Sequence, residues 1–241
     1  MKAKITSRRS LMITMLIVLA FFISSNPSWA KTQTPVVPVA VVEGVQGTVD
    51  MTTAGAEQPL KLVYGDILNS WDTIITNASS KLYLRWDTGV LTSVGESSSV
   101  SLVQNEPGNG PLNVLRLTKG FLRITKRSGG GNVSPYLVST PTVSVEPADY
   151  GSPVDFVIDV RSPRVTKVTV IAGPVKVYGL SGTRPTEFPV PGCHTVLISQ
   201  GGHLPKVVGI DTASLDKLVK RTTIPGTVVT DFACPVRTWL F

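Results

Sequence analysis

The sequence has few of the residues on which most enzyme active sites depend. Its 241 residues include two cysteines, Cys193 and Cys234, and two histidines, His194 and His203. A serine or cysteine nucleophile would need one of these histidines as its base. Cys193 and His194 are neighbours on an expected strand, where successive side chains point to opposite faces, so they would not pair unaided. We assign no catalytic residue, and a hydrolase or transferase using Cys193, His194 or His203 ranks last among the functions considered below.

Patterns that would bind a phosphate or a calcium ion are also missing. Three glycines at residues 129–131 could cradle a phosphate, but no Gly-Lys-Ser or Gly-Lys-Thr sequence follows them, which excludes a P-loop. Asp66, Asp72 and Asp87 each lie at an expected turn, where hydrogen bonding to nearby backbone groups is the ordinary role of aspartate. We therefore expect neither a metal nor a cofactor.

The apolar run near the N-terminus is too short to cross a membrane as a helix. It has 13 residues, 11–23, whereas a spanning helix needs about 20. Four basic residues precede the run and Ser28-Trp29-Ala30 follows it, which is the pattern of a signal peptide and its cleavage site. We expect cleavage after Ala30, which gives a periplasmic or secreted protein that contacts a membrane only through an uncleaved leader.

Two details of the leader concern its export route and anchoring. Ser7-Arg8-Arg9-Ser10-Leu11 also fits a twin-arginine motif, so Sec and twin-arginine export both stay open. No cysteine closely follows the apolar run, which argues against a lipid anchor. Residues 31–39 are polar and interrupted by prolines, and we expect a flexible mature N-terminus there.

Basic residues are not concentrated in the way that nucleic-acid binding requires. The chain has 23 Lys and Arg against 16 Asp and Glu, and cleavage of the leader removes four basic and no acidic residues, which leaves a net charge of about +3. Apart from Lys217, Lys220 and Arg221, the basic residues are spread singly and form no footprint for a phosphate backbone. No nucleic-acid partner is expected.

The two cysteines are most simply explained as one disulfide. Both lie in the part of the chain that we expect to be exported, and an even number of exported cysteines favours pairing. A Cys193–Cys234 disulfide would stabilise the C-terminal region by roughly 2–4 kcal/mol, mainly through the unfolded state. The alternative is a metal site that includes His194 and His203, although their spacing is not that of close ligands.

Residues 65–102 contain short apolar-alternating runs separated by turn residues, which predicts a β-meander. In residues 81–86 the side chains of Leu82, Leu84 and Trp86 fall on one face, the period-two pattern of a strand with one buried side. The opposite face, which we expect to be exposed, carries Lys81, Tyr83 and Arg85. This row is the candidate binding site.

The remaining patterns indicate more strands and one short helix. Residues 40–51 predict a first strand, in which Gly47 marks a bulge or a close backbone approach. Residues 113–117 and 121–125 predict a hairpin about residues 118–120. Asp211 is the expected N-cap of a helix of about ten residues, with Leu215 among its apolar positions. The fold class is therefore all-β, a meander, sandwich or β-roll of short strands with one short C-terminal helix.

The order of the glycines, aspartates and strands resembles the FecR-type periplasmic domain family. The resemblance extends roughly over residues 42–178, and its specificity lies in the order and spacing of weak single motifs. These motifs are Gly44-Val45-Gln46-Gly47-Thr48-Val49, Leu62-Val63-Tyr64-Gly65-Asp66-Ile67-Leu68, Trp71-Asp72-Thr73-Ile74-Ile75-Thr76, Leu82-Tyr83-Leu84-Arg85-Trp86-Asp87-Thr88-Gly89, Leu115-Arg116-Leu117-Thr118-Lys119-Gly120 and Thr169-Val170-Ile171-Ala172-Gly173-Pro174-Val175.

The resemblance implies a non-catalytic envelope module, with two departures from the family pattern. Residues 146–156 replace the Arg-Gly-Thr turn that usually follows the Thr-Pro strand. Family members that regulate iron uptake carry a cytoplasmic segment and a membrane helix before the periplasmic part, whereas the leader here begins almost at residue 1. We therefore do not expect direct contact with a cytoplasmic sigma factor.

The predicted organisation has four parts: a signal peptide at residues 1–30, a flexible segment at 31–39, a FecR-type β domain at 40–178 and a C-terminal extension at 179–241. The predicted function is an exported protein-binding module with a signalling or scaffolding role in the cell envelope. The alternative partner is a cell-wall glycan, for which Tyr83 would supply an aromatic contact. The oligomeric state is not predicted.

Overall fold

The computed structural model describes residues 38–105, 112–127, 136–180, 186–200 and 205–223. The chain divides into two units, Met1–Pro35 and Val36–Phe241, and all described residues belong to the second. The expected signal peptide, the glycines at 129–131, His203 and Cys234 lie outside the described residues. The predictions for them stay predictions.

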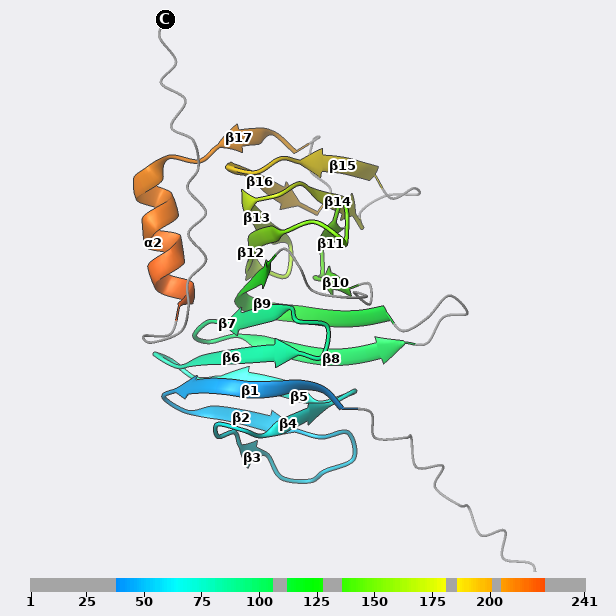
Figure 1. Cartoon of the computed structure of the whole chain (residues 1–241), viewed down its shortest axis with the longest axis vertical. Coiled ribbons are helices and arrows are strands. Elements are labelled where there is room, and N and C mark those ends of the chain that lie inside the picture. Colours follow the sequence, from blue (N-terminus) through cyan, green and yellow to red (C-terminus); the bar gives the residue numbers. More distant parts are fainter. Residues whose placement is uncertain (1–37, 106–111, 128–135, 181–185, 201–204, 224–241) are drawn as a thin grey trace, which may run out of the picture. The chain divides into compact units, whose positions relative to one another are not determined.

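The described strands form two sheets that share one strand, β9 (Figure 1). Sheet A has the order β4 (Ile67–Asn69), β1 (Pro38–Gln46), β6 (Lys81–Trp86), β7 (Leu91–Val94), β9 (Leu112–Lys126), β12 (Val154–Ser162), β13 (Val165–Ala172), β16 (His194–Ser199) and β17 (Val207–Gly209). Sheet B has the order β3 (Leu60–Lys61), β2 (Val49–Thr52), β5 (Thr73–Thr76), β8 (Ser99–Asn105), β9, β10 (Tyr136–Ser139), β11 (Val143–Pro147), β14 (Val175–Gly179) and β15 (Thr186–Val190). Among the described pairings only β9 with β10 is parallel, so the fold is a mixed, mostly β structure.

Strand β9 connects the sheets because its two halves have different neighbours. The half before Gly120 pairs with β8 and β10, and the half from Gly120 onward pairs with β7 and β12. The predicted hairpin about residues 118–120 is therefore wrong, since the two halves do not pair with each other. Gly120 has a φ of +84°, and a Cβ there would lie 2.2 Å from Ser98 Oγ. Position 120 therefore requires glycine for two reasons, the positive φ of its backbone and the close approach of Ser98.

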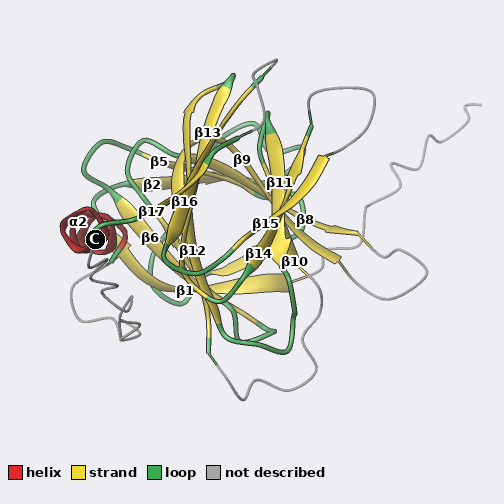
Figure 2. Ribbon diagram, turned by 90° about the horizontal axis from the view of Figure 1, so that it is seen from above, coloured by secondary structure: helices red, strands yellow, loops and turns green. Residues whose placement is uncertain are grey.

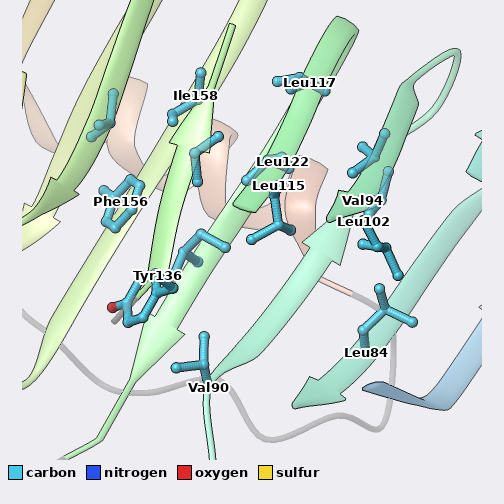
Figure 3. Close-up of a cluster of buried hydrophobic side chains, with 14 of the residues drawn as sticks. Leu84, Val90, Val94, Leu102, Leu115, Leu117, Leu122, Tyr136, Phe156 and Ile158 are labelled. Carbon is cyan, nitrogen blue, oxygen red and sulfur yellow. The ribbon is translucent and has the colours of Figure 1, made fainter. Parts of the chain in front are cut away.

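The core lies between the inner faces of the two sheets. One cluster of buried apolar side chains contains Leu84 and Phe156 from sheet A together with Leu102 and Leu115 from sheet B, and Figure 3 shows this cluster. The predicted alternation in β6 is confirmed, because Leu82, Leu84 and Trp86 are all buried in this cluster. Burial of each large apolar side chain contributes roughly 1.5–3 kcal/mol, which makes this cluster the main source of stability.

The first predicted strand, residues 40–51, is two strands in the structure. β1 belongs to sheet A and β2 to sheet B, and Gly47 lies between them with a φ of +74°. The backbone N–H of Thr48 donates to Ser80 Oγ at 2.9 Å, and a Cβ at Gly47 would lie 2.4 Å from the same oxygen. The predicted close approach at Gly47 is confirmed, and it is the point at which the chain changes sheets.

The predicted C-terminal helix is confirmed as α2 (Thr212–Thr222) with Asp211 as its N-cap. Asp211 Oδ1 accepts from the Ser214 backbone N–H at 2.8 Å. Figure 2 shows α2 outside the strands, on the side where β6 and β17 lie. Among the described residues, no helix has the length and apolar character that crossing a bilayer requires.

The strands that follow residue 179 belong to the same two sheets. β15 pairs with β14 in sheet B, and β16 pairs with β13 in sheet A. Val190 and Val196 are buried in the common core cluster. The boundary between a FecR-type domain and an extension at residue 178 stays a prediction, but these strands complete the sheets rather than stand apart from them.

Candidate binding surfaces

The predicted row of Lys81, Tyr83 and Arg85 lies on the outer face of sheet A, opposite the core. The expectation that its tyrosine is exposed is wrong, because Tyr83 is only 9% exposed. Burial is the main cause that raises the pKa of Tyr83, and the charge of Glu43 raises it further. The charges of Arg123 and Asp155, on β9 and β12 of the same sheet, also act on the pKa of Tyr83, the first lowering it and the second raising it. The row is not an open aromatic platform.

Arg85 and Lys81 are both engaged within the chain. The Arg85 guanidinium forms an ion pair with the Glu43 carboxylate, and this contact raises the pKa of Arg85. Lys81 Nζ donates to two backbone carbonyls near the end of α2, Lys220 O at 3.3 Å and Thr223 O at 3.0 Å. A cation is favoured at a helix C-terminus, where carbonyl groups lack helical partners. Binding of a partner through the row stays a prediction, while the structure gives Lys81 and Arg85 intramolecular partners.

A buried ion pair lies on the same outer face, between β9 and β12. Arg123 Nε donates to Asp155 Oδ1 at 2.8 Å and Arg123 Nη2 donates to Asp155 Oδ2 at 2.6 Å. The Arg123 and Asp155 side chains are 6% and 0% exposed. Arg123 Nη1 also lies 3.5 Å from Thr223 Oγ1 at the end of α2. The sequence does not predict this ion pair, because nothing in it indicates that β12 pairs with β9.

Helix α2 covers part of this face through few residues. Leu215 packs against Val157 of β12 and Ile171 of β13. At the other end, the Arg221 guanidinium lies 4.0 Å from the centre of the Phe121 ring and 3.9 Å from Glu96 Oε1. The helix is therefore held by apolar contacts in its middle and by cationic contacts near its C-terminus.

A second surface was not predicted, and it consists of apolar side chains at the ends of both sheets. We call it the apolar edge: Leu60, Val63, Tyr64 and Ile67, which are 61%, 59%, 77% and 57% exposed. β3 is the terminal strand of sheet B and β4 the terminal strand of sheet A, and Figure 1 shows them at the same end of the described strands. The signal in the sequence is a run of apolar residues too dense to fit one face of a strand.

The segment that carries the apolar edge has a fixed backbone. Asp66 Oδ2 accepts from the Val63 backbone N–H at 2.8 Å, and the Gly65 N–H donates to Val42 O at 2.9 Å. Gly65 has a φ of +89°, which favours glycine at this turn. The predicted turn role of Asp66 is confirmed, and this turn holds Val63 and Tyr64 in exposed positions.

The candidate catalytic residues do not meet in the described part of the chain. His194 Nδ1 lies 2.8 Å from the carbonyl oxygen of Gly192, and Cys193 Sγ lies 3.6 Å from Ile171 O. Within the described ranges, no three His, Cys, Asp or Glu side chains are grouped to hold a metal ion. The Cys193–Cys234 disulfide stays a prediction because Cys234 lies outside the described residues.

A tyrosine cluster surrounds Glu146 of β11. Tyr150 and Tyr178 donate their hydroxyls to the two oxygens of the Glu146 carboxylate at 2.5 Å and 2.6 Å. The hydrogen bond to Glu146 is the main cause that raises the pKa of Tyr178 to about 12, and burial raises the pKa of Tyr150. The Tyr136 ring meets that of Tyr150 edge to face, with 5.9 Å between centroids. The cluster ties a loop residue to β11 and β14.

Comparison with known proteins gives a partial similarity of fold. No protein-family model matches the chain, and no curated protein sequence matches it. Among the solved structures that are similar, two are described as a "putative anti-sigma factor" from Parabacteroides distasonis. The first has a TM-score of 0.47 at 11% identity, and its alignment covers 61% of this chain and 64% of the chain in that structure. The second has a TM-score of 0.45 at 12% identity, and its alignment covers 67% of this chain and 81% of the chain in that structure.

The first alignment thus spans less than two thirds of the solved chain. No function is carried over from it.

Proposed function

We propose that the protein is a non-catalytic binding module of the cell envelope, a FecR-type domain that is exported by a cleaved signal peptide and binds another envelope protein. The observation that carries this proposal is the apolar edge. Four large side chains of one eight-residue segment, residues 60–67, are each more than half exposed. Contiguous apolar patches on monomers commonly mark interaction sites.

The position of the apolar edge supports a protein partner. Terminal strands have backbone N–H and C=O groups on their outer side that no strand of the same sheet pairs with, and natural proteins usually protect such edges. An extended segment of a partner can add to the edge by backbone hydrogen bonds, while its apolar side chains pack on Leu60 and Ile67. The expected partner therefore presents an apolar strand-forming segment rather than a sugar.

Recovery of envelope proteins by the tagged mature protein tests this proposal. Ile67→Lys and Tyr64→Asp put charges into the apolar edge, and we expect each to lower the recovery of one specific envelope protein by at least about tenfold. Leu197→Lys is the matched control, since Leu197 is also an exposed apolar residue but belongs to β16. Thermal unfolding of each variant checks that the fold is kept.

Two outcomes would contradict the proposal. Equal recovery with all three variants would remove the apolar edge as the site. Binding to purified cell wall, unchanged by either edge substitution, would favour the glycan alternative. An enzyme would instead be indicated by turnover that is lost on replacement of His194 or His203.

A further inference from the structure

Basic side chains gather on the outer face of sheet A, where β12, β13, β16 and β17 lie side by side. Lys167 of β13 is the register partner of Leu197 of β16. Val196 is the partner of Val207 of β17, so the antiparallel register places Lys206 beside Leu197. We call this surface the basic–apolar patch: Arg161, Arg164, Lys167, Leu197, Lys206 and Val208.

The side chains of the patch lie on the side of the sheet away from the core. Val168 and Val196, the chain neighbours of Lys167 and Leu197, are buried in the core cluster. Because successive side chains of a strand point to opposite faces, Lys167 and Leu197 belong to the outer face. Leu197 and Val208 are 48% and 47% exposed, and they occupy diagonal positions on adjacent strands. An exposed apolar pair therefore lies within the basic surface.

The cations of the patch have few acidic partners. Arg161 forms an ion pair with Asp159 at 3.5 Å, and the Arg161 side chain is 54% exposed. None of the described ion pairs includes Arg164, Lys167 or Lys206. Four basic side chains against Asp159 give the patch a net charge of 4 − 1 = +3. The mature chain has about +3 in total, so its remainder is close to neutral and the positive charge is concentrated here.

We propose that the basic–apolar patch binds the surface of an anionic phospholipid bilayer, with its cations at the phosphate groups and Leu197 and Val208 at the boundary of the acyl chains. The sequence indicated a membrane contact only through an uncleaved leader, so this contact is additional. The inference does not depend on the proposed function. Sheet A has β4 at one end of its strand order and β17 at the other, and Figure 1 shows these two strands at opposite ends of the described strands. Binding through the patch therefore leaves the apolar edge accessible to a protein partner.

The combination of cations with apolar side chains favours a bilayer over other anionic ligands. Each Lys or Arg close to an anionic membrane increases affinity about fivefold, and this attraction falls off within a Debye length. An apolar side chain adds affinity where it leaves water, which it does at the acyl boundary of a bilayer. Free phosphate or a soluble polyphosphate would interact with the cations alone. The position of Leu197 between Lys167 and Lys206 therefore favours a phospholipid surface.

Flotation of vesicles with the purified mature protein, residues 31–241, tests the proposal. One set of vesicles contains phosphatidylglycerol and phosphatidylcholine in equal amounts, and the other contains phosphatidylcholine alone. We expect at least about tenfold tighter binding to the anionic vesicles, because the net positive charge of the patch is attracted by their surface potential. Higher salt should weaken this binding, because it screens the charges.

Substitutions in the patch test its two components separately. Lys167→Gln combined with Lys206→Gln should lower the affinity for anionic vesicles at least about tenfold. Leu197→Gln keeps the charge and should lower the affinity at least about threefold, because the new side chain gains nothing at the acyl boundary. The matched control, Arg116→Gln combined with Lys119→Gln, removes the same charge from exposed positions of β9 in sheet B. It should leave the affinity within about twofold of the wild-type value, since these positions lie outside the patch.

The proposal would be overturned by equal binding to both kinds of vesicle, or by equal losses with the patch pair and the control pair. Loss of binding with the lysine pair but not with Leu197→Gln would also overturn it, since that result indicates a site for anions in general. Lys167 is half-buried, so if the lysine pair does not fold, Lys206→Glu makes the same change of charge at an exposed position and replaces it. None of these substitutions alters residues 60–67 and the vesicles contain no protein, so failure here leaves the proposed function untouched.

Discussion

At the scale of single residues, the structure depends on polar groups whose partners come from distant parts of the sequence. Arg123 and Asp155 are 32 residues apart and form two hydrogen bonds in a site from which water is nearly excluded. The sequence shows both residues but not their pairing. Such a pair need not add stability relative to apolar residues, but the loss of one partner leaves a buried charge without compensation.

Asp155→Ala should therefore lower the free energy of unfolding by about 3–5 kcal/mol, because Arg123 then stays buried and unpaired. The matched control is Arg161→Ala at the exposed Arg161–Asp159 pair, where we expect a change of about 0–1 kcal/mol. Urea denaturation of the mature protein measures both. Equal effects of the two substitutions would contradict the assignment of the Arg123–Asp155 pair as buried.

Gly120 is the residue at which β9 passes from one sheet to the other. Gly120→Ala should cost more than about 2 kcal/mol, because its φ of +84° disfavours a side chain and a Cβ would lie 2.5 Å from Ser98 Cα. Gly89→Ala is the control, since Gly89 has a φ of +74° but no atom lies within 4 Å of its Cβ position. We expect the control to cost only about 1–2 kcal/mol. A Gly120→Ala variant as stable as the Gly89→Ala variant would argue against the passage of β9 from one sheet to the other at Gly120.

Tyr178 links stability to alkaline pH. Its pKa is raised to about 12 in the folded protein from an ordinary value of 10.0, so the folded state holds the phenolic proton more tightly. The stability it contributes is fully present below pH 10 and is lost as pH rises through about 12. The Tyr178→Phe variant should lose less stability than the wild type between pH 10 and about 12. Urea midpoints at pH 8, 10 and 12 measure this difference. An identical pH dependence of the two proteins would contradict the Tyr178–Glu146 bond.

At the scale of elements, the sequence predicted individual strands better than their neighbours. β6 has the predicted bounds, because it is a short alternating run between turn residues. β9 was predicted as a hairpin, since a glycine between two apolar runs has the same local pattern in a hairpin and in a strand that changes sheets. The helix was predicted from Asp211 and the apolar stripe, but the sheet face that it covers was not.

The expected disulfide would tie the C-terminal segment to the start of β16. We expect the exported protein to have no reactive thiol under denaturing, non-reducing conditions, and Cys193→Ser to lower the free energy of unfolding by roughly 2–4 kcal/mol. Thiol labelling followed by mass measurement tests the pairing. Two labelled cysteines in the exported protein would exclude it.

At the scale of the whole molecule, two sheets enclose one core and leave two kinds of outer surface. The alternation of apolar residues predicted the all-β class and the inward side chains of β6. It could not predict that Tyr83 is buried, because the exposure of an outer face depends on what packs over it. The apolar edge was missed for a related reason, since only the strand order shows that β3 and β4 are terminal.

The proposed binding of an envelope protein to the apolar edge is tested most directly by site-specific photo-crosslinking in living cells. A photoreactive amino acid at position 64 should crosslink to one defined envelope protein, and Ile67→Lys in the same chain should abolish that adduct. The same amino acid at position 197, on β16, should give no such adduct. An adduct that survives Ile67→Lys, or that forms equally from position 197, would contradict the claim.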